Sequence, residues 1–264
     1  MGRGMIILTG HKGFVGRNFL KNLEGEVIKV DKELIDWLVD EFDQWDKVDM
    51  VIHQGAISST VETDLNKIHR YNVDLTVKLF QKCIEYGIPV KYASSASVYG
   101  NSTERNINPL NYYALSKVQI DYWVEDHIKD FSLIQGFRYF NVYGDGEDDK
   151  GDQASPVSKF ANQVKETGKI KLFTGSKNFY RDFICVDDLV DIVLNNTKES
   201  GIYDLGTSDP VSFWYVADCV KRKYNGDIDW IEFPKHLKGK YQGYTKAFEE
   251  WGDYKFMTVE DYLK

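Results

Sequence analysis

Short apolar runs alternate with longer segments of helical periodicity along this chain. The runs Met5–Thr9, Val27–Val30, Asp49–His53, Val90–Ala93 and Leu133–Arg138 predict buried strands. Residues with helical periodicity predict helices at 17–23, 65–86, 112–131, 156–167, 186–195, 212–224 and 258–263, and a further strand is predicted at 170–173. Strands that alternate with helices favour a parallel sheet with helices on both faces.

A glycine-rich turn, Gly10 to Gly16, joins the first strand to the first helix. This order suits a pyrophosphate, because the backbone can approach the phosphates closely and the helix begins beside them. The second strand ends at Asp31, whose carboxylate would accept hydrogen bonds from adenosine ribose hydroxyls. Here the candidate cofactor residues are Gly10, Lys12, Gly13, Phe14, Val15, Gly16, Asp31 and Lys32.

The choice between NAD and NADP stays open at this point. Asp31 would repel the 2′-phosphate of NADP, whereas Lys12 and Lys32 could neutralise it. Asp36 is a candidate to lie near the adenine.

Small residues follow the third strand, where a ligand is expected to pass the end of a parallel strand. We interpret His53 as a packing residue rather than a base. The further cofactor candidates are Gln54, Gly55, Ala56, Ser58, Asn72 and Val142.

Tyr113 and Lys117 stand one helical turn apart on the same face of a predicted helix. A free phenol titrates near pH ~10, and a neighbouring ammonium favours its ionised form. Such a pair can accept a proton from an alcohol, as hydride transfer requires. Ser95, at the end of the fourth strand, could hydrogen-bond the same alcohol.

Composition narrows the classes of partner. A net charge of -8 without a basic stripe argues against nucleic acid. No window approaches the ~20 apolar residues that a membrane span needs, so we expect a soluble, cytoplasmic protein. Cys83, Cys185 and Cys219 are expected to be buried free thiols, and no metal site is predicted.

Four motifs together resemble the extended short-chain dehydrogenase/reductases, the NAD-dependent epimerase and dehydratase family. They are Thr9–Gly16, Ser94–Gly100, Tyr113–Lys117 and Phe137–Gly144. Further segments resemble members that act on an ADP-linked heptose, namely 53–60, 136–144, 150–151, 154–155, 171–176, 178–179, 181–183 and 237–242.

The resemblance implies an α/β fold, a Rossmann-type doubly wound parallel sheet with a small C-terminal substrate-binding lobe. It makes residues 1–264 one unit, in which 1–150 mainly bind the dinucleotide. Residues from about 150–182 and 204–264 would mainly form the lobe, and 183–203 would return to the first part. It also implies a homo-oligomer and a role in carbohydrate metabolism and lipopolysaccharide biosynthesis.

Catalytic roles are implied as well. Tyr113 would be a base, Lys117 would hold the nicotinamide ribose and lower the pKa of Tyr113, and Ser95 would steady the reacting oxygen. Lys150 would be the second proton-transfer group in a sugar that is oxidised and then reduced again. The substrate-binding candidates are Ser95, Asn141, Lys150, Asp152, Lys159, Phe173, Thr174, Gly175, Ser176, Arg181 and Tyr241.

Several residues depart from the family pattern. Asp152 and Lys159 stand where a serine and a histidine are expected near the sugar, and Tyr71 and Asp204 each replace an asparagine. Two alternatives therefore stay open. One is an epimerase, dehydratase or reductase on another nucleotide-sugar, and the other is a non-catalytic NAD(P)-sensing protein.

Overall fold

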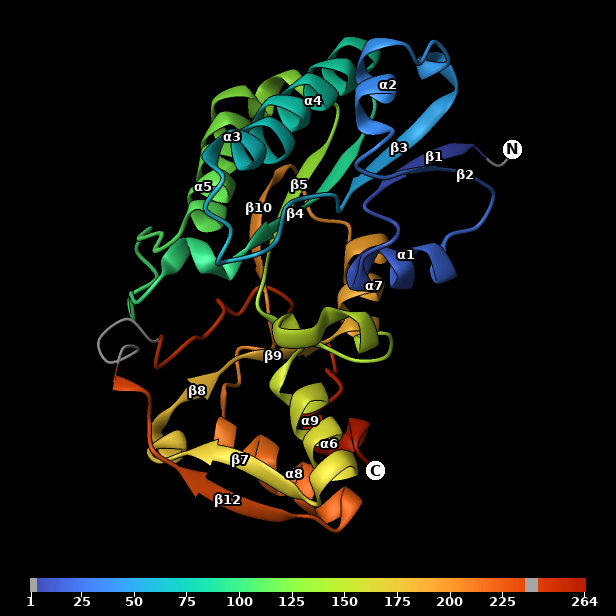
Figure 1. Cartoon of the computed structure of the whole chain (residues 1–264). Coiled ribbons are helices and arrows are strands. Elements are labelled where there is room, and N and C mark those ends of the chain that lie inside the picture. Colours follow the sequence, from blue (N-terminus) through green and yellow to red (C-terminus); the bar gives the residue numbers. More distant parts are fainter. Residues whose placement is uncertain (1–3, 236–241) are drawn as a thin grey trace. The chain divides into compact units, whose positions relative to one another are not determined.

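The computed structural model describes residues 4–235 and 242–264, and the candidate Tyr241 lies outside them (Figure 1). The chain divides into two compact units. Unit 1 comprises residues up to 100, 107–138 and 190–203, and unit 2 comprises 101–106, 139–189 and 204–264. Within the described ranges, none of the helices combines the length and apolar character that crossing a membrane requires.

Unit 1 is built on a six-stranded sheet in the order β10-β5-β4-β3-β1-β2. Its strands are β1 (Met5–Thr9), β2 (Glu26–Val30), β3 (Val48–His53), β4 (Val90–Ser95), β5 (Ile134–Tyr139) and β10 (Gly201–Leu205). The pairs β1/β2, β1/β3 and β3/β4 are parallel. The predicted α/β class with a Rossmann-type parallel sheet is confirmed. The strand order reverses beside β1, which is where such sheets bind ligands.

Helices cover both faces of this sheet. They are α1 (Phe14–Asn22), α2 (Ile35–Asp40), α3 (Leu65–Ile68), α4 (Leu75–Tyr86) and α5 (Tyr112–His127). In Figure 1, α3, α4 and α5 lie together on one side of the sheet and α1 lies on the other. This split follows from right-handed crossovers, because the chain moves one way from β1 to β2 and the other way from β3 to β4.

The predicted helix 65–86 is helical along its whole length, but its turns at His69–Asp74 are π-helical, and this segment lies between α3 and α4. Gly87 ends α4 in the left-handed conformation, with a φ of 65°. The core of unit 1 lies between this helix, α5 and the sheet, where Leu79, Phe80 and Tyr92 are buried. Burial of these large side chains is the main stabilisation of the unit.

The described part of unit 2 has its own apolar core and three two-stranded sheets. Its strands are β6 (Asn141–Tyr143), β7 (Lys169–Phe173), β8 (Tyr180–Arg181), β9 (Phe183–Cys185), β11 (Val211–Ser212) and β12 (Asp227–Ile231), paired as β6/β9, β7/β12 and β8/β11. Its helices are α6 (Pro156–Thr167), α7 (Val186–Asn195), which continues into unit 1, α8 (Phe213–Tyr224) and α9 (Val259–Tyr262). Phe160, Ile170 and Val216 are among the core residues.

Three local signals explain why α6 has the predicted bounds. The Ser155 hydroxyl accepts a hydrogen bond from the Ser158 amide, and Pro156 occupies the first helical position. Gly168 then ends the helix with a φ of 73°. The three cysteines are buried and unpaired, as predicted.

Candidate active site

The glycine turn keeps the end of β1 close to the start of α1. Gly10 has a φ of 71°, and a side chain there would meet the Gly55 amide nitrogen at 2.6 Å. At Gly16 a side chain would collide with the Gly10 carbonyl. Gly13 precedes α1, and no side chain caps this end of the helix, which is the arrangement of helix starts that bind anions. Phe14 is buried and anchors the helix.

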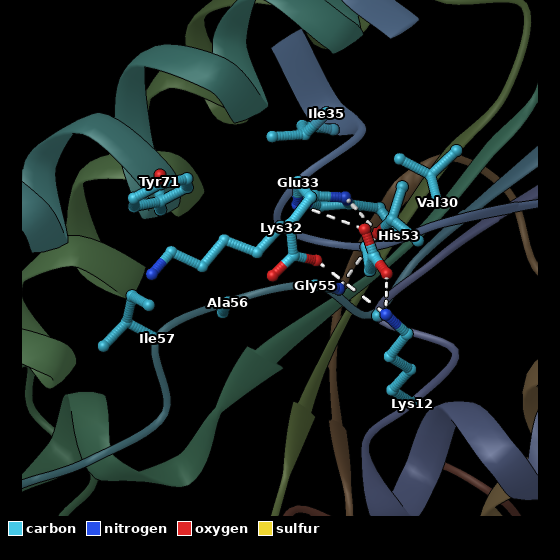
Figure 2. Close-up of a pocket in the computed structure, with 13 residues that line it drawn as sticks. Lys12, Val30, Lys32, Glu33, Ile35, His53, Gly55, Ala56, Ile57 and Tyr71 are labelled. Carbon is cyan, nitrogen blue, oxygen red and sulfur yellow. Dashed lines mark hydrogen bonds and ion pairs between the residues drawn. The ribbon is translucent and has the colours of Figure 1, made fainter. Parts of the chain in front are cut away.

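A cavity of about 280 Å³ opens at the carboxyl ends of β1, β2 and β3 (Figure 2). Six of the predicted cofactor residues line it, namely Gly10, Lys12, Asp31, Lys32, Gly55 and Ala56. Sequence reasoning assigned no cofactor role to the other lining residues Thr9, Val30, Glu33, Ile35, His53, Ile57 and Tyr71. Ile35 had a usable signal, since an apolar residue just after the acidic end of the second strand would flank an adenine.

Asp31 is the charged centre of this cavity. The Lys12 ammonium forms an ion pair with its carboxylate, and the Glu33 amide donates a hydrogen bond to it at 3.1 Å. The Lys12 hydrogen bond is the main reason why the pKa of Asp31 falls to about 2. Figure 2 shows Lys32 extending toward Tyr71, with its ammonium 4.9 Å from the centre of that ring.

The remaining predicted cofactor residues do not line the cavity. Ser58 is exposed, and the Asn72 amide exchanges hydrogen bonds with the Ile57 backbone at 2.7 and 3.0 Å. Asn72 therefore positions the segment that follows β3. Val142 belongs to β6 in unit 2. Gln54 is half-buried, and its backbone N–H donates a hydrogen bond to the Thr9 carbonyl at 3.3 Å.

His53 is a packing residue, as predicted. Its two ring nitrogens lie 2.8 Å from the Thr9 hydroxyl and 3.0 Å from the Thr76 hydroxyl. Burial lowers the pKa of His53 to about 3, and the positive charge of Lys117 acts in the same direction. The ring is therefore neutral at physiological pH. Asp36 does not line the cavity, and its carboxylate oxygens each accept a hydrogen bond from Arg70 at 2.8 Å.

The structure brings Ser95, Tyr113 and Lys117 together in unit 1. The Asn111 side chain caps α5, so Tyr113 lies in the first turn of the helix and Lys117 in the second. Ser95 is the last residue of β4 and hydrogen-bonds the Tyr113 phenol. The Lys117 ammonium lies 5.9 Å from the centre of the Tyr113 ring and donates a 2.6 Å hydrogen bond to the Ala93 carbonyl.

Burial controls the charge of this trio. It raises the pKa of Tyr113, which the hydrogen bond with Ser95 only partly offsets, and it lowers the pKa of Lys117 to about 8. The net shift of the Tyr113 pKa is therefore upward, opposite to the direction expected from Lys117. Desolvation is its largest cause and the Asp121 carboxylate adds to it, while the Lys117 ammonium is directed at the Ala93 carbonyl.

The other candidates lie in unit 2. Lys150 is in a 3-10 helix at Asp148–Gln153, and burial lowers its pKa, as does the neighbouring Lys159. The buried Glu147 carboxylate closes this segment by accepting hydrogen bonds from the Gly144 amide and from the Ser155 amide and hydroxyl. The structure describes the backbone of Asp152 but not its side chain.

Arg181 is buried in unit 2, and its guanidinium lies 5.4 Å from the centre of the Phe213 ring. The neighbouring Asp182 carboxylate accepts hydrogen bonds from the Thr207, Ser208 and Ala247 amides, which fixes this segment. Asn141 donates its amide to the Asp182 carbonyl at 3.1 Å, so it lies beside the Arg181 strand.

The segment from Phe173 to Ser176 follows β7 in the same unit. The Phe173 ring packs against Phe233, with 5.5 Å between the ring centres. Thr174 and Gly175 are exposed, whereas Ser176 is buried. The exposed pair is thus the part of this segment that a ligand can reach.

Comparison with known proteins agrees with this geometry. The chain is 38% identical to an ADP-L-glycero-D-manno-heptose-6-epimerase of Brachyspira hyodysenteriae, over 92% of this chain and 89% of that protein. A crystal structure of the Helicobacter pylori enzyme of the same name has a TM-score of 0.83 at 26% identity, covering 99% of this chain and 94% of that one.

A more distant structure shares the fold. It is a UDP-N-acetylglucosamine 4-epimerase from Methanobrevibacter ruminantium M1, with a TM-score of 0.81 at 17% identity, covering 100% of this chain and 98% of that one. The model of the NAD dependent epimerase/dehydratase family matches residues 6–206, which include the glycine turn, Asp31 and the Ser95, Tyr113 and Lys117 trio. The chain belongs to the NAD dependent epimerase/dehydratase family.

Proposed function

We propose that this protein is a nucleotide-sugar epimerase that inverts C6″ of an ADP-linked glycero-manno-heptose. The observation that carries the proposal is the joint placement of Ser95, Tyr113 and Lys117 at the end of β4. Similarity to the Brachyspira epimerase over nearly the whole chain supports the substrate.

The residues of unit 1 fit a dinucleotide. The glycine turn leaves room for a pyrophosphate, and the cavity with Asp31, Ile35 and Tyr71 suits an adenosine. A bound nicotinamide supplies an acceptor that takes a hydride from the sugar and returns it. Lys117, whose ammonium lies beside the Tyr113 ring, would hold the nicotinamide ribose.

Because the pKa of Tyr113 is raised in this structure, the phenol must first lose its own proton. In the proposed reaction the phenolate then accepts the proton of the C6″ hydroxyl while Ser95 hydrogen-bonds the same oxygen. Loss of the proton and of a hydride leaves an exocyclic aldehyde, which can rotate about a single bond and present its other face. A proton must then reach an oxygen that lies on the opposite side. Lys150 is the proposed second proton-transfer group, because a buried lysine with a lowered pKa exchanges a proton more readily.

Unit 2 is the proposed sugar-nucleotide lobe. Arg181 suits a diphosphate, because its planar guanidinium can form paired, charge-assisted hydrogen bonds. Asn141, Lys159 and the segment from Phe173 to Ser176 remain the proposed neighbours of the sugar nucleotide.

NAD is the preferred cofactor in this account. The charges beside the adenosine end of the cavity cancel, because Lys12 pairs with Asp31 and lies 3.8 Å from Glu33, while Lys32 faces Tyr71. A 2′-phosphate would meet the Asp31 carboxylate and compete with it for Lys12. The ribose hydroxyls of NAD can instead donate to that carboxylate.

The test is turnover of defined sugar nucleotides. Purified protein is incubated with each C6″ epimer of ADP-heptose and with UDP- and GDP-sugars, and the product stereochemistry is read by NMR. The proposal predicts interconversion of the two ADP-heptose epimers. It also predicts that a deuterium placed at C6″ is retained in ordinary water, since the hydride is returned. Loss of that label to solvent would contradict the mechanism.

A different nucleotide-sugar is the second candidate. Lys159 lies near enough to Lys150 to lower its pKa, and the family pattern has a histidine at position 159. Conversion of a UDP- or GDP-sugar alone would support this candidate. Binding of NAD(H) without conversion of any sugar would support the sensing protein.

A homodimer is proposed as the working assembly. Tyr112, Leu115 and Tyr122 form an apolar stripe on α5 and are 43%, 43% and 56% exposed. Such a stripe suits a second copy of α5. Light scattering should give twice the chain mass, and a Leu115→Lys variant should give a monomer.

A cytoplasmic location of the protein also stays a prediction.

A further inference from the structure

A buried carboxylate, Asp121, lies one helical turn beyond Lys117 on α5 and is 2% exposed. Its oxygens accept three hydrogen bonds, from the Tyr92 hydroxyl at 3.0 Å, the Ser94 hydroxyl at 2.9 Å and the Arg138 Nε at 2.9 Å. The donors come from β4 and β5, so Asp121 ties α5 to two neighbouring strands.

Arg138 completes the network. Its Nη1 donates to the Tyr99 hydroxyl at 2.9 Å, and its guanidinium lies 5.3 Å from the centre of the Tyr99 ring. An ion pair this deeply placed loses its hydration, so it is weak evidence for stability. A buried pair of this kind suggests a role other than stability alone.

The network contacts the segments that carry the reacting trio. Ser94 precedes Ser95 on β4, and the Ala93 carbonyl accepts the Lys117 hydrogen bond. Asp121 lies on the same helix as Tyr113 and Lys117. Displacing Asp121 would therefore move α5 relative to Ser95, and the hydrogen bond between Ser95 and the phenol depends on that placement.

The charges of the network also affect the pKa values of the reacting trio. The Asp121 carboxylate raises the pKa of both Tyr113 and Lys117, which opposes the effect of burial on Lys117. Arg138, paired with Asp121, carries the opposite charge. On β3, His53 is neutral and lies close enough to Lys117 for that charge to lower its pKa. On α5, Glu125 acts on the network by raising the pKa of Tyr92.

We propose that Asp121 and Arg138 are positioning residues, which hold Tyr113 and Lys117 against the end of β4 and set the electrostatic potential at both groups. Asp121 favours the protonated forms of the phenol and the ammonium, and Arg138 offsets part of this. The catalytic meaning of the inference rests on the proposed function, but the electrostatic effect can be measured without any substrate.

The experiment is an NMR titration of the intact protein with carbon-13 at tyrosine Cζ and lysine Cε. Signals are assigned with Tyr113→Phe and Lys117→Gln. Asp121→Asn should lower both pKa values by about one unit, because an anion near the two groups is lost. Arg138→Met should raise both, because the remaining carboxylate is no longer offset.

Two further variants make the result decisive. The double variant Asp121→Asn with Arg138→Met is neutral at both positions and should lie between the two single variants. Tyr92→Phe removes one uncharged donor to the same carboxylate and should move neither titration by more than about 0.3 unit. If Asp121→Asn does not fold, Arg138→Met and the double variant should still shift the pKa values of Tyr113 and Lys117 in opposite directions from those of the wild-type protein.

The inference is overturned if folded Arg138→Met and the double variant titrate alike, or if both follow Tyr92→Phe. The network would then be a scaffold without influence on the charge of the trio. With a converted sugar in hand, the pH profile of turnover should move to lower pH in Asp121→Asn and to higher pH in Arg138→Met. If no sugar is converted, the proposed function fails, and the titration still decides the inference.

Discussion

Two ion pairs in unit 1 each join an aspartate to a basic side chain, in very different surroundings. Lys12 and Asp31 lie at the rim of the adenosine cavity, with side chains that are 68% and 12% exposed. Arg138 and Asp121 lie behind the reacting trio, with side chains that are 16% and 4% exposed. Water surrounds the Lys12 end of the first pair, whereas both partners of the second pair are largely buried.

The difference shows what each pair can do. An exposed pair contributes little to folding and can give up a partner to a ligand, which suits a site that must choose between two cofactors. A buried pair cannot be opened without leaving a charge in the protein interior. It is therefore suited to fixing geometry and potential, and experiments that break each pair should give unlike results.

Stability should show the largest contrast. Asp121→Ala leaves the Arg138 cation buried without its carboxylate and should cost about 3–5 kcal/mol of unfolding free energy. Asp31→Ala, at the exposed pair, should cost much less in urea unfolding, within about 1 kcal/mol. Equal losses in the two variants would contradict the distinction.

Cofactor choice should respond only to the exposed pair. Asp31→Ser removes the carboxylate that repels a 2′-phosphate and frees Lys12, so the ratio of NADP to NAD affinity should rise about 10- to 100-fold. Adding Lys12→Ala to Asp31→Ser should remove most of that gain. Titration calorimetry with both cofactors gives the ratios, and a ratio that stays constant in Asp31→Ser would refute the assignment of the cavity.

Acid should act on a buried and on a partly exposed side chain of the adenosine cavity at different pH values. The folded pKa of His53, about 3, lies below its usual value of 6.5, so the unfolded chain binds its proton more tightly. Stability should be complete above pH 6.5 and fall by about 1.4 kcal/mol per pH unit below it. The pKa of Asp31 is lowered from 3.8 to about 2, so its smaller contribution to the free energy of unfolding is lost only below pH 3.8.

The control for this prediction is His53→Asn, which should flatten the decline between pH 6.5 and 4. Urea unfolding at a series of pH values measures it. A slope that persists in the variant would assign the proton uptake to another group.

The sequence predicts those parts of the fold that depend on local signals. The helices Pro156–Thr167 and Val186–Asn195 have the bounds predicted, and the cap and end of the first are readable as Ser155 and Gly168. The π-helical segment at His69–Asp74 has no such signal, because it accompanies contacts of Asn72 with residues distant in the sequence.

The site too has parts that local sequence signals predict and parts that depend on the folded structure. Spacing alone places Tyr113 and Lys117 on one face, and the glycine pattern with Asp31 locates the cavity. The direction of the Tyr113 pKa shift depends on burial, and burial is a property of the folded protein. Asp121 could have been found from its position four residues after Lys117, whereas its partner Arg138 lies on a strand that only the fold brings near.

The central claim is that Tyr113 accepts the proton of the sugar's C6″ hydroxyl. The most direct measurement compares turnover of ADP-heptose by wild-type protein and Tyr113→Phe in the same NMR assay, with cofactor binding measured in parallel. The account predicts a rate about 10²- to 10⁴-fold lower with cofactor affinity nearly unchanged. Equal turnover in the two proteins would contradict it.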